Sequence, residues 1–349
     1  MKLQGSGNNY QAWEVDVKDF PEQGTTQEQL FFLLRYAVLA PSSHNSQPWK
    51  FKIEGNTIFI FADEKRSVPV ADPDGRLERV AVGAALENVL IAADYFGFTT
   101  EVQYFPRGWG KDRPVAVVIL KKREVIRRPT EHLLLAIPKR YSNRHPYRND
   151  PLPDAFLKQV SLVANYGVAV NVVTEPNKKS ELADIILEAR EAEFDIKPFR
   201  EEIAHWKRNN WTRSEVGMPG FTMGFSTLLS FITSPVIRRK NVAKLTRKKD
   251  EEVLKQCTPA MIVVSSKEDS RELQIKSGQT FERLALLATQ HQLDTNIMVA
   301  AIAFGNYYQR IQKVLGSSFR PQLFFRIGYA QAPMRHSPRL AAEAVTERA

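Results

Sequence analysis

Two stretches of the sequence, separated by a constant offset of 195 residues, share one pattern of apolar and small residues. Residues 82–93 and 277–288 are both predicted to form amphipathic helices, because apolar residues recur at i, i+3, i+4 and i+7. Gly83 and Gly278 lie near the two helix starts, where a small residue permits close packing against another element. Amphipathic helices also share such patterns by chance, so two tandem halves and a coincidence both stay open.

A rigid polar loop is predicted at residues 40–49, APSSHNSQPW, between an expected helix at 29–39 and an expected strand at 50–52. Proline fixes φ, the small serines let a flat ligand approach, and the amide side chains offer both donors and acceptors. These properties suit the edge of a planar heteroaromatic ring, although any four of the residues alone also fit an ordinary polar turn. The residues expected to contact such a ring are Pro41, Ser42, Ser43, Asn45 and Gln47. Trp49 is expected to anchor the following strand in the core.

Two basic motifs are candidates for binding a phosphate. Arg140 and Arg144 flank Ser142, and arginines at i and i+4 present donors that suit the oxygens of a phosphate monoester. Ser337 and Arg339 follow an expected strand at residues 322–328 and offer a second set of donors. Taken singly, each motif is more often an ordinary basic surface patch than a phosphate site.

Together these motifs resemble the FMN-dependent nitroreductase family, and in particular its two-halved, Acg-like branch, over about residues 25–340. In an ordinary member, each subunit carries both the arginine motif and the Pro-Ser-Ser loop, and two subunits pair to complete each site. Here the first half keeps only the loop, and the second half keeps only the arginines. The resemblance implies an α+β fold with a mostly antiparallel sheet in each half. The two tandem halves, residues 1–127 and 128–349, would form an intramolecular pseudo-dimer with one flavin site at their interface.

The resemblance also implies FMN as the cofactor and assigns a role to each matching residue. The loop residues would contact the isoalloxazine ring, and Arg140, Ser142 and Arg144 would hold the phosphate, with Ser337 and Arg339 closing over it. No catalytic acid or base and no metal site is predicted, because flavin N5 itself accepts and returns a hydride. Many active members have a Glu-Gly pair after the equivalent of Leu293. This chain has Asp294 and Thr295 there, so the donor to N5 is unassigned.

A lid-like insertion is expected at about residues 185–249. Its stretch from Val216 to Ile237 carries no charged residue and has the length of a membrane span, but glycines and prolines interrupt it, which favours a mobile apolar cover over an anchor. Seven positive charges within residues 238–249 account for much of the net charge of +10. A solvated helix face is the favoured reading of this cluster, with an anion or lipid contact second.

The leading functional hypothesis is an NAD(P)H-dependent oxidoreductase that passes hydride through FMN to a nitroaromatic, quinone or similar flat acceptor. The alternative is a protein that binds or sequesters FMN without turnover. Binding to nucleic acid or a membrane surface through the basic cluster is a weaker third, and neither nucleic acid nor stable membrane insertion is expected. The chain is expected to be a monomer or a higher homo-oligomer. The N-terminus has no apolar signal region, which favours the cytoplasm, and Cys257, the single cysteine, is expected to be structural.

Overall fold

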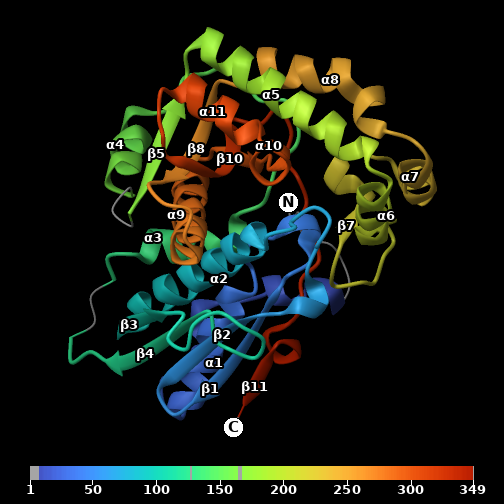
Figure 1. Ribbon diagram of the computed structural model, residues 1–349. Coiled ribbons are helices and arrows are strands. Elements are labelled where there is room, and N and C mark those ends of the chain that lie inside the picture. The colour runs from blue at the N-terminus through green and yellow to red at the C-terminus, as the bar shows by residue number, and fades with distance from the viewer. Residues whose placement is uncertain (1–7, 126–127, 164–166, 349) are drawn as a thin grey trace.

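The computed structural model describes residues 8–125, 128–163 and 167–348 and contains two halves that meet along two long helices (Figure 1). The first half has a five-stranded sheet of order β11-β1-β2-β4-β3, and the second has a four-stranded sheet of order β5-β8-β10-β9. The strands of the first sheet are β1 (Trp49–Glu54), β2 (Thr57–Ala62), β3 (Phe98–Tyr104), β4 (Ala116–Lys122) and β11 (Thr346–Arg348). Those of the second are β5 (Val168–Val173), β8 (Ala260–Ser266), β9 (Asp294–Ile297) and β10 (Arg320–Gly328).

Both halves repeat one order of elements: a helix, two strands, a long helix and two strands. In the first half α1 (Thr26–Ala37) precedes β1 and β2, and α2 (Arg76–Tyr95) precedes β3 and β4. In the second half α4 (Asp154–Val163) and α9 (Arg271–Gln290) take the same places. All pairings within the two four-stranded repeats are antiparallel, and only β11 joins its sheet in parallel. The α+β fold with two tandem halves is therefore confirmed.

The long helices α2 and α9 cross where their glycines lie, and the contacts at the crossing are reciprocal. A Cβ atom added at Gly83 would lie 2.0 Å from the carbonyl oxygen of Ile275, and one added at Gly278 would lie 2.0 Å from that of Val80. The offset of 195 residues relates Gly83 to Gly278 and Val80 to Ile275, and it also relates the first and last residues of the two helices. Reciprocal contacts of this kind define a two-fold interface, here within one chain. The repeat is therefore structural and not a coincidence.

Local sequence accounts for how the site-bearing loop is held. A capping box between Thr25 and Glu28 starts α1. Gly55 and Asn56, with Gly55 at φ +56°, form the tight turn between β1 and β2. Residues 38–48 separate α1 from β1, and this stretch contains the predicted polar loop except for Trp49, which begins β1. Only residues 164–167 separate α4 from β5, so the second half lacks room for a loop of that length.

The insertion is longer than predicted and begins earlier. Residues 174–259 lie between β5 and β8, where the first half has only the turn between β1 and β2. The predicted start at residue 185 falls within α5, because that amphipathic helix is continuous from the strand onward. The insertion contains α5 (Pro176–Asp195), α6 (Lys197–Trp206), β6 (Lys207–Arg208), β7 (Met218–Pro219), α7 (Thr227–Arg239) and α8 (Val242–Gln256).

The charge-free stretch from Val216 to Ile237 is not a plain loop, because it contains β7, a 3-10 turn and α7. Among the described residues, no helix combines the length and the apolarity that a membrane span needs. Trp49 is fully buried, as predicted, and Cys257 is a half-buried free thiol just before β8. The expected boundary at residues 127 and 128 adjoins residues outside the description and stays a prediction, as does the location inferred from residues 1–7.

The C-terminal segment returns to the first half, which the sequence analysis did not anticipate. Short helices α10 (Ala300–Ala303) and α11 (Tyr307–Leu315) cover the second sheet, and α3 (Glu131–Leu134) lies between the halves. After β10 the chain runs back to place β11 beside β1, with Phe51 opposite Thr346. This path brings residues 334–340 against the predicted polar loop, so segments from both halves and the tail meet at one place.

Candidate functional site

The predicted polar loop is a tight, irregular turn. His44, Asn45 and Gln47 have φ of 53°, 56° and 56°, in the left-handed region that residues other than glycine seldom adopt. The Ser42 hydroxyl accepts a hydrogen bond of 2.9 Å from the backbone N–H of Gln47, which closes the turn. Three such residues in one loop are costly and persist only where the surrounding contacts hold them. The loop is therefore shaped by its neighbours.

Those neighbours are the insertion and the C-terminal tail. Asn45 Nδ2 donates to the carbonyl oxygens of Gly217 and Pro338, both at 3.0 Å. Gln47 Nε2 donates to the carbonyl oxygen of Glu215 at 2.7 Å, and its Oε1 accepts from the backbone N–H of Leu340 at 2.9 Å. The amide groups of Asn45 and Gln47 thus hold the surrounding backbone in place in this structure.

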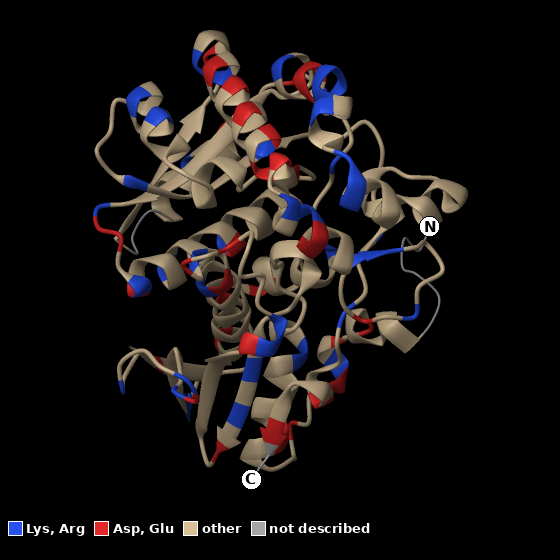
Figure 2. Ribbon diagram, turned by 45° about the vertical axis from the view of Figure 1, so that its right-hand side comes forward, with Lys and Arg blue, Asp and Glu red and all other residues tan. Residues whose placement is uncertain are grey.

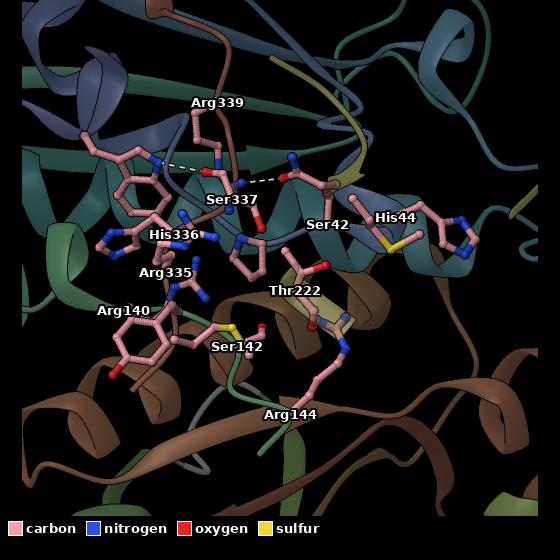
Figure 3. Close-up of a pocket in the computed structure, with 16 residues that line it drawn as sticks. Ser42, His44, Arg140, Ser142, Arg144, Thr222, Arg335, His336, Ser337 and Arg339 are labelled. Carbon is pink, nitrogen blue, oxygen red and sulfur yellow. Dashed lines mark hydrogen bonds between the residues drawn. The ribbon is translucent and has the colours of Figure 1, made fainter. Parts of the chain in front are cut away.

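Most of the predicted site residues surround one cavity of about 70 Å³ (Figure 3). Its lining includes eight of them, drawn from the loop, the arginine motif and the tail: Pro41, Ser42, Asn45, Arg140, Ser142, Arg144, Ser337 and Arg339. An adjoining cavity of about 650 Å³ shares part of this wall and is also lined by Ser43. Gln47 is fully buried behind the loop and lines neither cavity. The structure thus brings together motifs that lie up to 300 residues apart.

The smaller cavity is strongly positive. Four arginines line it, and no carboxylate is present among its described lining residues. Arg140 forms a buried ion pair of 3.1 Å with Glu282 and donates to the carbonyl oxygen of Leu39 at 2.9 Å. Glu282 therefore balances one of the charges, and burial raises the pKa of its carboxyl. Among the described residues, the other three arginines form no such ion pair.

Two of the other three arginines, Arg144 and Arg339, are destabilised as cations. Burial, with repulsion from Arg326, lowers the pKa of Arg144 to about 10, and its Nη1 donates to the carbonyl oxygen of Thr222 at 3.0 Å. Burial, with repulsion from Arg140, lowers the pKa of Arg339 to about 9. Arg339 donates to Asn45, while its buried Nε has no hydrogen-bond partner in the part of the chain that the structure describes. Buried, repelling cations with a spare donor fit an anion that neutralises them.

Two histidines near these cations are neutral. Burial, together with Lys207 and Arg144, lowers the pKa of His44 to about 3. Burial, together with Arg339 and Arg140, does the same for His336. The His336 ring stacks on Trp13 at 4.0 Å, and the Trp13 indole donates to the carbonyl oxygen of Ser337 at 2.9 Å, which positions the tail. These imidazoles do not supply a proton at neutral pH.

Sequence reasoning missed several charged or polar residues of the larger cavity. Lys207 lies in β6, and its buried Nζ has no hydrogen-bond partner within the described ranges of the chain. Burial, with repulsion from Arg144 and Arg190, lowers the pKa of Lys207 to about 7. Arg326 stacks on the Tyr147 ring at 4.0 Å. A lone lysine in a long insertion has no local sequence pattern that predicts a site. Arg326 was predicted only as part of the strand at residues 322–328, not as a residue of the site.

The segment that replaces the Glu-Gly pair also reaches the larger cavity. Residues 296–300 line it, and the side-chain oxygen of Asn296 is buried without a hydrogen-bond partner among the described residues. Asn296 is therefore a polar side chain that this segment contributes to the larger cavity. The sequence could have indicated it, because Asn296 lies just after Asp294 and Thr295, which stand in place of the Glu-Gly pair. In the described part of the chain, no cluster of three or more His, Cys, Asp or Glu side chains is arranged to hold a metal ion.

Comparison with known proteins gives relatives of similar length. No protein-family model matches the sequence. The chain is 23% identical over 334 residues to "Putative NAD(P)H nitroreductase Rv3131" of Mycobacterium tuberculosis, covering 94% of this chain and 92% of that protein. It is 34% identical over 86 residues, 25% of this chain, to "Putative NAD(P)H nitroreductase acg" of the same organism. The FMN-dependent nitroreductase NfnB of Mycobacterium smegmatis, solved with NADPH, is 16% identical with a TM-score of 0.41, covering 62% of this chain and 97% of that chain.

The two curated relatives confirm the resemblance predicted from the motifs. The first extends over nearly the whole of both chains, and the second is Acg itself. The protein is thus similar to putative NAD(P)H nitroreductases, one of which is Acg. Its own two halves pack against each other through α2 and α9, as the resemblance to the two-halved branch predicts.

Proposed function

We propose that this protein is an FMN-dependent oxidoreductase that takes hydride from NADH or NADPH and passes it to a nitroaromatic, quinone or similar flat acceptor. The observation that carries the proposal is the cavity where the loop of one half meets the arginines of the other, with a surplus of buried positive charge. The names of the curated relatives support the same activity.

The residues present fit FMN. Its phosphate would be held by Arg140, Ser142 and Arg144, with Ser337 and Arg339 from the tail. Its ring would lie against Pro41, Ser42 and Ser43, at the edge of the larger cavity. That cavity has the size and the mainly apolar wall of sites that bind small molecules. FMN, when bound, supplies the two-electron hydride chemistry.

The chain itself contributes position and charge. The loop and the insertion close the cavity on two sides, which limits the access of water to the reacting groups. Arg144, Lys207 and Arg326 line the larger cavity and would supply positive charge to stabilise negative charge on the reduced flavin, with Lys207 contributing in its protonated form. Because His44 is held neutral, we assign no acid or base to this chain.

One observation favours the alternative of FMN binding without turnover. The carbonyl oxygens of Glu215, Gly217 and Thr222 accept hydrogen bonds from Gln47, Asn45 and Arg144, so this part of the insertion is tied to the site. A cover fastened in this way restricts the approach of a nicotinamide to the ring. The alternative therefore predicts bound flavin that external reductants reach slowly.

The cofactor assignment is tested by flavin content and affinity. We expect a yellow protein with about one FMN per chain, because only one loop and one arginine motif are present. Arg144→Ala should weaken FMN binding roughly 10-fold to 150-fold, since a hydrogen bond to a charged group contributes roughly 1.5–3 kcal/mol. Arg148→Ala is the matched control, because Arg148 is half exposed and pairs with Asp150.

Riboflavin separates the phosphate from the ring. It should bind much more weakly than FMN to the unaltered protein and should bind equally well to the Arg144→Ala variant. FMN binding that is unchanged in a variant lacking both Arg140 and Arg144 would refute the phosphate assignment, and two FMN per chain would refute a single site.

A further inference from the structure

Helix α7 exposes apolar side chains and buries polar ones, the reverse of what is usual for a helix at a water-exposed surface. The buried residues of α7 are Ser230, Thr233 and Ile237, spaced i, i+3 and i+7. The exposed side chains of the helix include Leu228 at 82%, Ile232 at 53% and Leu229 at 50%. A surface helix ordinarily turns its polar residues outward. Helix α7 therefore carries an apolar face that the described chain leaves uncovered.

The polar groups on the inner face of α7 are bonded within the fold. The Ser230 hydroxyl donates to the carbonyl oxygen of Thr227 and accepts from the backbone N–H of Asn210 at 3.0 Å. The Thr233 hydroxyl donates to the carbonyl oxygen of Ser230 at 3.0 Å. Turning the helix to bury its leucines would break the bond to Asn210. The outward position of the apolar face is therefore built into the packing.

Aromatic side chains extend this face. The Trp211 ring, 75% exposed, meets the edge of Phe231 at 5.4 Å between ring centroids. We call the whole exposed set the α7 patch: Trp211, Leu228, Leu229, Phe231, Ile232 and Val236. In Figure 1, α7 lies at the right-hand edge of the molecule, beside α6. By contrast, α5 in the same insertion has the usual charged outer face, as Figure 2 shows.

Positive charge adjoins the α7 patch. Arg238, Arg239 and Lys240 lie at the C-terminal end of α7, just after Ile237. They are exposed and form no ion pair with any residue that the structure describes. Cations at a helix C-terminus complement the helix dipole, which alone explains their place. Next to an exposed apolar and aromatic face, however, they also match the pattern of helices that lie in the interface of an anionic membrane.

We propose that the α7 patch docks this protein on the surface of an anionic lipid bilayer, without spanning it. The apolar face would enter the headgroup region, with Trp211 at the level where tryptophan is favoured, and the adjacent cations would contact lipid phosphates. A second copy of this chain fits less well, because in a symmetric dimer the same patch lies on both sides and offers no acidic partner to the adjacent cations. Binding to nucleic acid would use the cations but would leave the exposed apolar face unexplained. The proposal does not depend on the activity proposed above.

The large cavity opens beside this docking face. Leu229, Ile232 and Val236 belong to the α7 patch and also line the cavity of about 650 Å³. Docking would therefore bring this part of the cavity wall to the membrane surface. If the proposed oxidoreductase activity holds, a lipid-soluble quinone is the acceptor class that this arrangement serves.

Binding to vesicles tests the proposal directly. The full chain is sedimented with vesicles of phosphatidylcholine alone or with about a third of phosphatidylglycerol, at low and high salt. We expect binding to the anionic vesicles that weakens with salt. Replacing both Arg238 and Arg239 by glutamine should reduce it about 30-fold, from about 1 kcal/mol per charge. The same change at the exposed Lys121 and Lys122 of β4, far from α7, is the control and should have no effect.

The apolar contribution is tested separately. Leu228→Ser and Phe231→Ser together should reduce binding at least about tenfold, because each removes a side chain that would leave water. Leu162→Ser on α4 is the matched control, since Leu162 is 70% exposed on another part of the surface. The altered side chains are largely exposed, so thermal melting should show folded variants. Absence of binding to anionic vesicles at low salt would overturn the proposal. So would a concentration-dependent dimer that Leu228→Ser abolishes, which would assign the patch to a second copy.

Discussion

Substituting alanine for Gly83 tests the internal two-fold contact most sharply. The new Cβ would lie 2.0 Å from the carbonyl oxygen of Ile275, whereas ordinary contact is 3.4–4 Å. The obstacle is backbone, so α2 and α9 must move apart by roughly 1 Å or more and lose packing along the crossing. Overpacking costs about 1–3 kcal/mol and sometimes more, and the better helix propensity of alanine returns about 1 kcal/mol. We expect a net loss of about 2 kcal/mol.

The two-fold relationship between α2 and α9 predicts the same loss of stability for a substitution at Gly278. Gly278→Ala meets the carbonyl oxygen of Val80 at the same 2.0 Å, so it should cost a similar amount. The double variant should lose less than the sum, because one separation of the helices relieves both clashes. A loss of about 2 kcal/mol lowers Tm by about 3 °C in a chain of this length. Differential scanning fluorimetry measures it, with Gly110→Ala as the control, since only the flexible Arg113 side chain lies near that position.

A higher or unchanged Tm in either single variant would refute the close reciprocal packing. A large effect from one glycine and none from the other would contradict the two-fold relationship. An effect of Gly110→Ala beyond about 0.5 kcal/mol would show that the assay does not isolate the helix crossing.

Two buried titrating groups yield pH predictions. Burial raises the pKa of Glu193 to about 8, so its contribution to stability is complete below pH 4.5 and is lost as pH rises toward 8. Glu193→Gln should remove a slope of up to about 1.4 kcal/mol per pH unit in urea unfolding between those values. Burial lowers the pKa of Lys207 to about 7, so stability falls as pH decreases from 10.5 toward 7. Lys207→Met should stabilise the flavin-free protein at pH 7 more than at pH 10 in the same assay, and equal effects at both pH values would contradict an unpaired buried ammonium.

Much of the architecture was predictable because it is local. The offset between residues 82–93 and 277–288 reflects two helices whose bounds repeat at that spacing, and the 40–49 loop occupies the predicted place between helix and strand. The resemblance to a family of paired subunits also predicted that the loop would lie near Arg140 and Arg339. In the structure these residues line one cavity.

Other features depend on contacts between distant segments and have no local signal. The insertion begins where β5 ends, because α5 continues from that strand, and its charge-free stretch contains a helix. Asn45 and Gln47 use their amides to hold the insertion and the tail, partners about 170 to 290 residues away. Lys207 becomes part of the cavity only when β6 packs beside the arginine motif.

Anaerobic reduction of the bound flavin is the measurement that tests the proposed function most directly. With purified protein containing FMN, NADH or NADPH should bleach the visible absorbance without oxygen, and a quinone or nitroaromatic should then restore it in a separate half-reaction. Because both substrates must approach the same ring face, steady-state rates should follow ping-pong kinetics. If dithionite bleaches the flavin while neither nicotinamide does so at millimolar concentration over minutes, the oxidoreductase proposal is wrong and the protein binds FMN without turnover.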